Sequence, residues 1–162
     1  MPKDKDGPSP ILWLNRPGHL NRTRWHRLRL LIVATLILLT IQGWFGDTVN
    51  IFLIPTTSPT VDQSASGLYQ AIVNIGPTLF IHAFLGIAIL AFGVIVLAFS
   101  LRSKPRNVQV PAILGLVMVI SAIIGGTLFV LSGFNNGGVS AQMGGSFIGA
   151  YAFYFIELYY AK

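Results

Sequence analysis

The sequence predicts an all-α integral membrane protein, a polytopic four-helix bundle whose N-terminus and C-terminus both lie in the cytoplasm. Of its 162 residues, 53% are hydrophobic and 10% are charged, whereas soluble domains are about a quarter charged. Four apolar stretches approach or exceed the roughly 20 residues that a helix needs to cross a bilayer. Lysine and arginine are confined to segments that four crossings would place on one side of the membrane.

The expected spans cover about residues 30–53, 77–101, 110–132 and 142–161. Pro77 and Pro111 lie near the starts of the second and third spans, where a missing N–H costs little. The run Asn135-Asn136-Gly137-Gly138 predicts a turn before the fourth. Continuous apolar runs lack the alternation of a membrane barrel, so each span has to be a helix.

Orientation follows from the eleven lysines and arginines, which occur in the N-terminal segment, in the 102–106 loop and at Lys162. The segments 46–76 and 133–142 contain none. Cytoplasmic loops of membrane proteins carry this excess of positive charge. We therefore expect a multi-pass protein of the cell membrane.

Residues 1–27 are predicted to form a basic, partly disordered cytoplasmic tail, and residues 28–162 the membrane domain. Four arginines near the first span are expected to contact anionic lipid headgroups: Arg22, Arg24, Arg27 and Arg29. The topology accounts for the net charge of +6, and no nucleic-acid-binding pattern is present. Membrane lipids are thus expected partners, and nucleic acid is not.

The loop between the first two expected spans contains a short segment with a helical pattern. From Leu68 to Ile75, apolar residues recur at helical spacing. Leu68, Ala71, Ile72 and Ile75 would face lipid or the mouth of the bundle, with polar residues outward. This pattern predicts a short interfacial helix.

His82 is the main candidate for chemistry, because an ionisable residue inside a span is a functional hypothesis by default. An imidazole can bind haem iron or carry protons. His19 and His26 are expected on the opposite side of the membrane, so the second histidine of a b-type haem site is missing. We expect His82 to hydrogen-bond Ser146, Asn135 or Gln142. We expect no cofactor, and the alternative is that His82 binds haem b.

Glu157 is the only acid in the second, third and fourth expected spans. We expect it to reach the cytoplasmic interface and pair with Arg102, Lys104 or Arg106. If it instead faced the interior, proton coupling would become a serious hypothesis. The spans contain no paired carboxylates for dyad catalysis, and the absence of cysteine excludes thiolate chemistry and cysteine-ligated metal. No metal site or enzymatic activity is expected.

Small residues recur at spacings that let helices approach closely. The residues concerned are Gly86, Gly93, Ser121, Gly125, Gly145 and Gly149. They predict helix packing within the chain or between chains.

Four short segments carry a resemblance to a known group of proteins: Asn50-Ile51-Phe52-Leu53-Ile54-Pro55, His82-Ala83-Phe84-Leu85-Gly86, Ser121-Ala122 and Gly133-Phe134-Asn135. In this layout the chain resembles small four-helix membrane proteins of prokaryotes that have no assigned activity. The resemblance spans about residues 30–162. It implies the topology and points to Asn50, Pro55, His82 and Asn135. The chain also resembles, more faintly, four-helix haem proteins of the respiratory chain, but it lacks their second in-span histidine.

The sequence therefore favours a non-enzymatic membrane protein that packs as an accessory subunit of a membrane complex or as a homo-oligomer. One alternative is a haem-binding or redox subunit that uses His82. The other is a small transporter or channel that uses His82 or Glu157.

Overall fold

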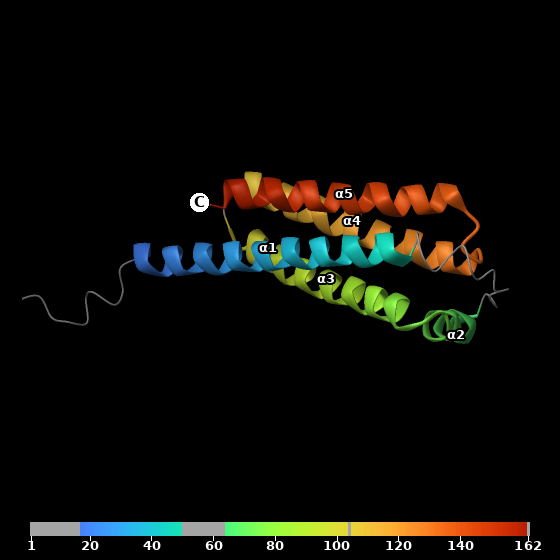
Figure 1. Cartoon of the computed structure of the whole chain (residues 1–162). Coiled ribbons are helices and arrows are strands. Elements are labelled where there is room, and N and C mark those ends of the chain that lie inside the picture. Colours follow the sequence, from blue (N-terminus) through green and yellow to red (C-terminus); the bar gives the residue numbers. More distant parts are fainter. Residues whose placement is uncertain (1–16, 50–63, 104, 162) are drawn as a thin grey trace, which may run out of the picture.

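The computed structural model describes residues 17–49, 64–103 and 105–161. This part of the chain contains five helices (Figure 1): α1 (Pro17–Thr48), α2 (Ala65–Ile75), α3 (Pro77–Leu101), α4 (Arg106–Leu131) and α5 (Gly137–Tyr160). The prediction of an all-α fold is confirmed. Asn50, Pro55, Lys104, Lys162 and the first sixteen residues lie outside the described residues.

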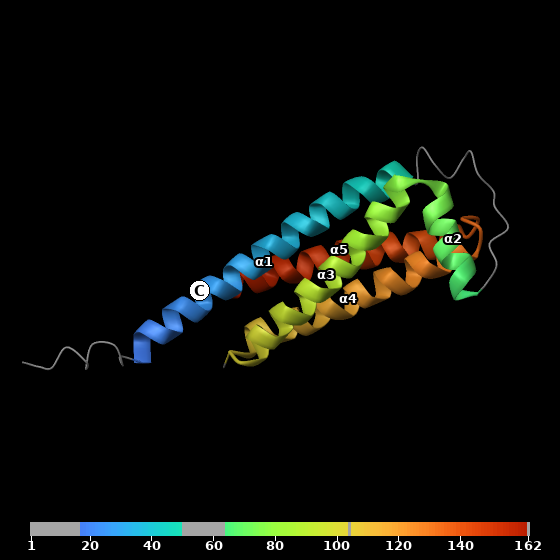
Figure 2. The same cartoon turned by 90° about the horizontal axis from the view of Figure 1, so that it is seen from below.

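Helices α1, α3, α4 and α5 form an elongated bundle in which each packs against the next and α5 returns to α1. Helix α2 contacts α3 and α4 and lies at one end of the bundle (Figure 2). At the opposite end α1 projects past its neighbours, beside the α3–α4 connection and the C-terminal end of α5. We call this the basic end, because it carries Arg24, Arg27, Arg29, Arg102 and Arg106, and we call the other the α2 end.

Among the described residues, three segments are long and apolar enough to cross a membrane: Thr23–Thr48, Pro77–Leu101 and Arg106–Leu131. Their mean hydropathies are 1.9, 2.7 and 2.5. Within the apolar 18-residue stretch of each segment, however, only 22% to 28% is buried inside the protein. Side chains such as Phe84, Ile87 and Ile124 point outward. Since a soluble protein rarely exposes so continuous an apolar surface, these helices are suited to a lipid environment.

Helix α5 does not meet the same criterion of length and hydropathy. Its sequence is rich in glycine and tyrosine and includes Gln142 and Glu157. A fourth membrane crossing therefore depends on the position of α5 in the bundle rather than on its own composition.

The helix bounds match the expected spans best at α3, which covers the predicted 77–101. Helix α4 starts earlier than predicted, at Arg106, after the extended residue Pro105, and Pro111 lies inside it. Pro111 removes only a bond near the helix start, where few backbone N–H groups have intrahelical partners. Helix α1 likewise begins at Pro17, so the predicted tail is helical from that residue onward.

The predicted turn before the last helix divides into two parts. Gly133 and Phe134 both adopt φ of 64° and form the turn. Asn136 caps α5, since its side chain accepts a hydrogen bond from the Val139 N–H at 3.2 Å. Asn is a favoured N-cap, so Gly137 and Gly138 open the helix instead of ending the loop.

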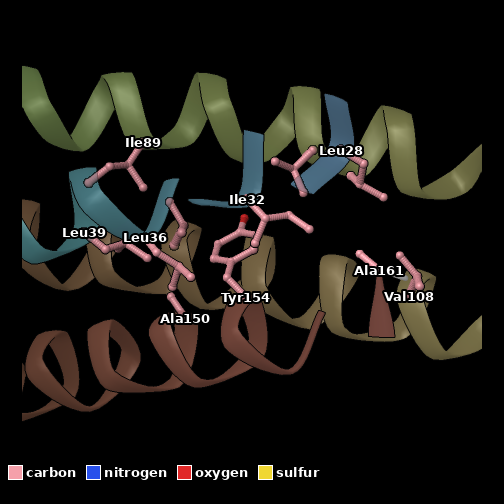
Figure 3. Close-up of a cluster of buried hydrophobic side chains, with 11 residues drawn as sticks. Leu28, Ile32, Leu36, Leu39, Ile89, Val108, Ala150, Tyr154 and Ala161 are labelled. Atoms are coloured by element: carbon pink, nitrogen blue, oxygen red, sulfur yellow. The ribbon is translucent and has the colours of Figure 1, made fainter. Parts of the chain in front are cut away.

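The apolar core has two parts. The larger cluster occupies the bundle toward the basic end and joins α1, α3, α4 and α5 through residues such as Ile32, Val96, Val119 and Tyr154. Figure 3 shows the Tyr154 side chain extending from α5 into this cluster beside Ile32. The smaller cluster lies under α2 and includes Leu79, Phe129 and Phe134.

Helix α2 contains the predicted segment Leu68–Ile75 and starts at a Ser64 cap, whose Oγ accepts the Gly67 N–H at 3.1 Å. Ala71 is buried, and Leu68 and Ile72 pack on the smaller cluster. Gln70 and Asn74 are exposed. A single residue, Gly76, with φ of 129°, separates α2 from α3. The apolar face of α2 therefore covers the mouth of the bundle.

Candidate functional site

The α2 end of the bundle contains a cavity of about 380 Å³. All five helices contribute to its wall, and most of the lining is apolar, including Leu68, Leu79, Ile89, Val119, Ile123 and Phe147. The polar contributors are few: Gln42, Asp47, His82, Thr127 and Ser140. A mostly apolar concavity with a few convergent polar groups is the usual form of a small-molecule site.

Gln42 of α1 and His82 of α3 form the polar centre of this cavity. Gln42 Nε2 lies 3.3 Å from His82 Nε2. Gln42 Oε1 and His82 Nδ1 are both buried, and neither has a hydrogen-bond partner within the described residues. Buried polar atoms are seldom left unpaired in proteins, so a ligand or water that reached these two atoms would complete their hydrogen bonds.

Glycines around this pair leave room for it. A Cβ at Gly46 would lie 3.0 Å from His82 Cε1, so a side chain there would press on the imidazole. A Cβ at Gly86 would lie 3.6 Å from Gln42 Nε2, which is an ordinary contact. Gly46 is needed for close approach of α1 to His82, whereas Gly86 keeps space open.

The sequence-based expectation for the partner of His82 was wrong. His82 pairs with Gln42 rather than with Ser146, Asn135 or Gln142. Ser146 instead lies 2.9 Å from Ser121, where the two hydroxyls join α4 to α5, and Gln142 donates to Ser121 at 3.4 Å. The signal that could have identified Gln42 is its position as a lone amide in an apolar run next to Gly43.

The second polar site lies toward the basic end, where Glu157 of α5 meets Ser100 of α3. Both residues are 0% exposed, and Ser100 Oγ lies 2.5 Å from Glu157 Oε1. The predicted salt bridge to Arg102, Lys104 or Arg106 is wrong for the two arginines, because Glu157 faces the interior and they are exposed. Lys104 lies outside the described residues. The sequence alone does not show how α5 is rotated about its own axis, so it could not show which way Glu157 faces.

Tyr154, one helical turn before Glu157, fills a slot between α3 and α4. A Cβ at Gly93 would lie 2.7 Å from the Tyr154 hydroxyl, and a Cβ at Gly115 would lie 3.1 to 3.3 Å from three carbons of its ring. The hydroxyl itself is buried and has no partner among the described residues. The two glycines therefore admit the ring and bring α3, α4 and α5 together.

The remaining candidate residues are distributed over both ends. Gly125 contacts Met143, and Gly149 contacts Met118, so both lie where α4 and α5 meet. Gly145 is exposed and has no neighbour within 4 Å, and Asn135 is exposed in the α4–α5 connection. The side chains of Arg24, Arg27 and Arg29 are exposed, and Arg24 donates to the Arg102 carbonyl at 3.4 Å. Arg22 lies in α1, but its side chain is outside the described ones.

The residues needed for a metal or haem site converge only in part. In the described parts of the chain, no three histidine, aspartate or glutamate side chains group as they would around a metal ion. His82 and Met143 both line the cavity, while His26 lies on α1 toward the basic end. The cavity thus offers one imidazole and one thioether as potential axial ligands, with His82 Nε2 already engaged by Gln42.

Searches of protein-family models, curated proteins and solved structures found no match to this chain. They therefore assign it to no family, and the functional argument rests on the geometry of the two polar sites.

Proposed function

We propose that the chain is a multi-pass protein of the cell membrane in which α1, α3, α4 and α5 all cross the bilayer. Three of these helices are apolar enough by themselves, and α5 packs between α1 and α4 along the bundle. The described arginines gather at the basic end, which favours a cytoplasmic position for that end. There Arg24, Arg27 and Arg29 would meet anionic headgroups.

Because the chain contains no cysteine, single cysteines can test this topology. Replacement of Arg102 should give a thiol that a membrane-impermeant maleimide modifies only after the cells are opened. Replacement of Tyr69, which is exposed on α2, should give a thiol that reacts in intact cells. The opposite pattern, or reaction of both in intact cells, would refute the proposed orientation.

Within this topology, we propose that the protein is not an enzyme and binds a small, uncharged, amphipathic molecule in the cavity below α2. The observation that carries the proposal is the pair of unpartnered atoms, Gln42 Oε1 and His82 Nδ1, in a largely apolar cavity of about 380 Å³. An apolar lining stabilises an alkyl or ring body, while a few placed polar groups orient a ligand.

The hydrogen-bonding needs of that ligand follow from the pair itself. If Gln42 Nε2 donates to His82 Nε2, then His82 Nδ1 carries the hydrogen and Gln42 Oε1 remains an acceptor. If the Gln42 amide is rotated by about 180°, its oxygen accepts from the His82 Nε2–H, the Gln42 NH₂ becomes the unused donor and His82 Nδ1 becomes the unused acceptor. In both cases the pair, whose two residues line the cavity, keeps one unused donor and one unused acceptor. A hydroxyl group can satisfy both, so a long-chain or cyclic alcohol is the simplest ligand.

A photoreactive long-chain alcohol provides the test. We expect saturable labelling of cavity-lining peptides in membranes, with an excess of the same alcohol without the photoreactive group as competitor. Gly86→Leu should fill the cavity and abolish the saturable part, whereas Gly86→Ala should retain it, since a Cβ at Gly86 makes only ordinary contacts. Replacing Gln42 and His82 by leucine should weaken binding on the order of tenfold, as expected for about 1.4 kcal/mol of lost hydrogen bonding.

Two results would refute this function. One is wild-type labelling that an excess of alcohol does not reduce. The other is unchanged saturable labelling in Gly86→Leu, provided that the variant unfolds at a temperature close to that of the wild type.

A second candidate function, packing against another membrane protein or a second copy, is favoured by the outer face of α5. Five residues of this helix are exposed: Gly144, Gly145, Ile148, Ala152 and Phe155. A Cβ added at either glycine would meet nothing within 4 Å. Small residues let a partner helix approach closely in a membrane. A partner on this face would also cover the bundle helix that, among the described residues, is not apolar enough by itself to be a candidate membrane span.

This candidate predicts that Ile148→Cys forms an oxidative cross-link between copies or to a co-purifying chain. Val94→Cys, on the exposed face of α3, is the matched control and should stay monomeric. Absence of any cross-link at Ile148, together with a single chain in native mass spectra from nanodiscs, would exclude stable packing through α5.

A further inference from the structure

Glu157 and Ser100 form an interior site that the cavity proposal does not use. Glu157 Oε2 is buried and has no hydrogen-bond partner among the described residues, while Oε1 lies 2.5 Å from Ser100 Oγ. The site joins α5 to α3, two helices that face each other diagonally in the bundle. Its chemistry therefore bears on how the bundle is held together toward the basic end.

The hydrogen atoms available at this site do not suffice if Glu157 is ionised. Ser100 Oγ lies 2.9 Å from the Val96 carbonyl oxygen and 2.5 Å from Glu157 Oε1, but a serine hydroxyl has one hydrogen. Carbonyl and carboxylate oxygens both only accept, so one of the two contacts would lack a hydrogen. A protonated Glu157 completes both contacts: its O–H donates to Ser100 Oγ, and the Ser100 O–H donates to Val96.

The lack of a cation in contact with Glu157 among the described residues favours the same state. Glu157 shares the basic end with Arg29 of α1, Arg102 of α3 and Arg106 of α4, all of which are exposed. No lysine, arginine or histidine of the described residues forms a salt bridge with it, and Tyr154 of its own helix also contributes an unpartnered buried oxygen. A buried carboxylate without a cation is very unfavourable, whereas a neutral carboxyl is tolerated.

We infer that Glu157 is a proton-binding site inside the bundle, and that the bound proton joins α5 to α3 through Ser100. Loss of the proton leaves a buried carboxylate that can accept the single Ser100 hydrogen only if Ser100 gives up the Val96 carbonyl. We expect α5 then to separate from α3, so that the carboxylate gains access to water toward the basic end. This inference concerns a site apart from the cavity and does not depend on the proposed ligand.

The composition of the chain allows a direct measurement. Glu157 is the only glutamate in the sequence, so cell-free synthesis with glutamate labelled with carbon-13 at the carboxyl carbon gives one reporter signal. In nanodiscs at neutral pH we expect the chemical shift of a protonated carboxyl. A signal at the carboxylate position under these conditions would overturn the inference, and this measurement needs no variant.

A second experiment separates proton binding from a merely structural contact. Glu157→Gln keeps the shape of the side chain and an N–H that can donate to Ser100 Oγ, but it cannot ionise. As pH rises from about 4 through neutral, we expect the thermal unfolding midpoint of the wild type to fall, because the folded state keeps a proton that the unfolded chain releases at about pH 4.3. The midpoint of Glu157→Gln should change much less over the same range. Parallel decreases in the two proteins would contradict the inference.

Discussion

The two ends of the bundle use glycine in opposite ways. Toward the basic end, the Tyr154 side chain occupies the space beside Gly93 and Gly115, and the surrounding residues form an apolar core. Toward the α2 end, Gly86 faces only the end of the Gln42 side chain and borders the cavity. A glycine on a helix face therefore permits either tight packing or an opening. The size of the side chain opposite decides which of the two results.

The largest effect that would test this comparison is expected at Tyr154. Tyr154→Ala should lower the free energy of unfolding by about 3–5 kcal/mol, as for other large aromatic residues removed from a core. Tyr154→Phe should be close to neutral, because the lost hydroxyl has no partner among the described residues. Reversible unfolding in detergent measures both, and a small loss in Tyr154→Ala would show that the slot is not a packing centre.

A somewhat smaller effect is expected for Ser100→Ala. This change leaves the buried Glu157 carboxyl without its hydrogen-bond partner, at a cost of about 1–3 kcal/mol. Ser121→Ala is the control, since Ser121 is only partly buried and its contact with Ser146 joins two neutral hydroxyls. Equal losses in the two variants would mean that the Glu157 site is no more important than an ordinary polar contact.

The glycines themselves give the next effect. Gly93→Ala places a Cβ 2.7 Å from the Tyr154 hydroxyl and 3.1 Å from Leu116, so overpacking of about 1–3 kcal/mol outweighs the gain in helix propensity, which is up to about 1 kcal/mol. Gly86→Ala should instead be neutral or slightly stabilising. Thermal unfolding of the two variants compares them, and similar midpoints would remove the distinction between the two ends.

The smallest effect on stability is expected at the polar centre of the cavity. Replacing Gln42 and His82 together by leucine removes both members of one hydrogen-bonded pair, and such paired replacements by apolar groups are close to neutral. We expect a change of less than about 1 kcal/mol in unfolding free energy, together with alcohol binding weakened on the order of tenfold. A large loss of stability would indicate that the pair holds α1 to α3 rather than receiving a ligand.

Hydropathy was sufficient to predict the long helices, and the helical spacing of apolar residues was sufficient to predict the short helix before α3. They could not predict the partners of His82 and Glu157, because the rotation of each helix about its axis decides whether Gln42 or Ser146 meets the imidazole. Helices α3 and α5 carry apolar residues of their own on every face, so the spacing of these residues says little about which face is interior. The Tyr154 slot was missed for the same reason, although Gly93 had been identified from its spacing.

The single-residue junction at Gly76 links the cover of the cavity to its wall. Since φ is 129° there, any other L-residue would strain the corner, and no spacer exists to absorb a shift between α2 and α3. Residues 65–101 therefore behave as one bent unit, whose short arm covers the cavity while its long arm presents His82. Entry of a ligand past α2 would have to tilt the histidine-bearing helix as well.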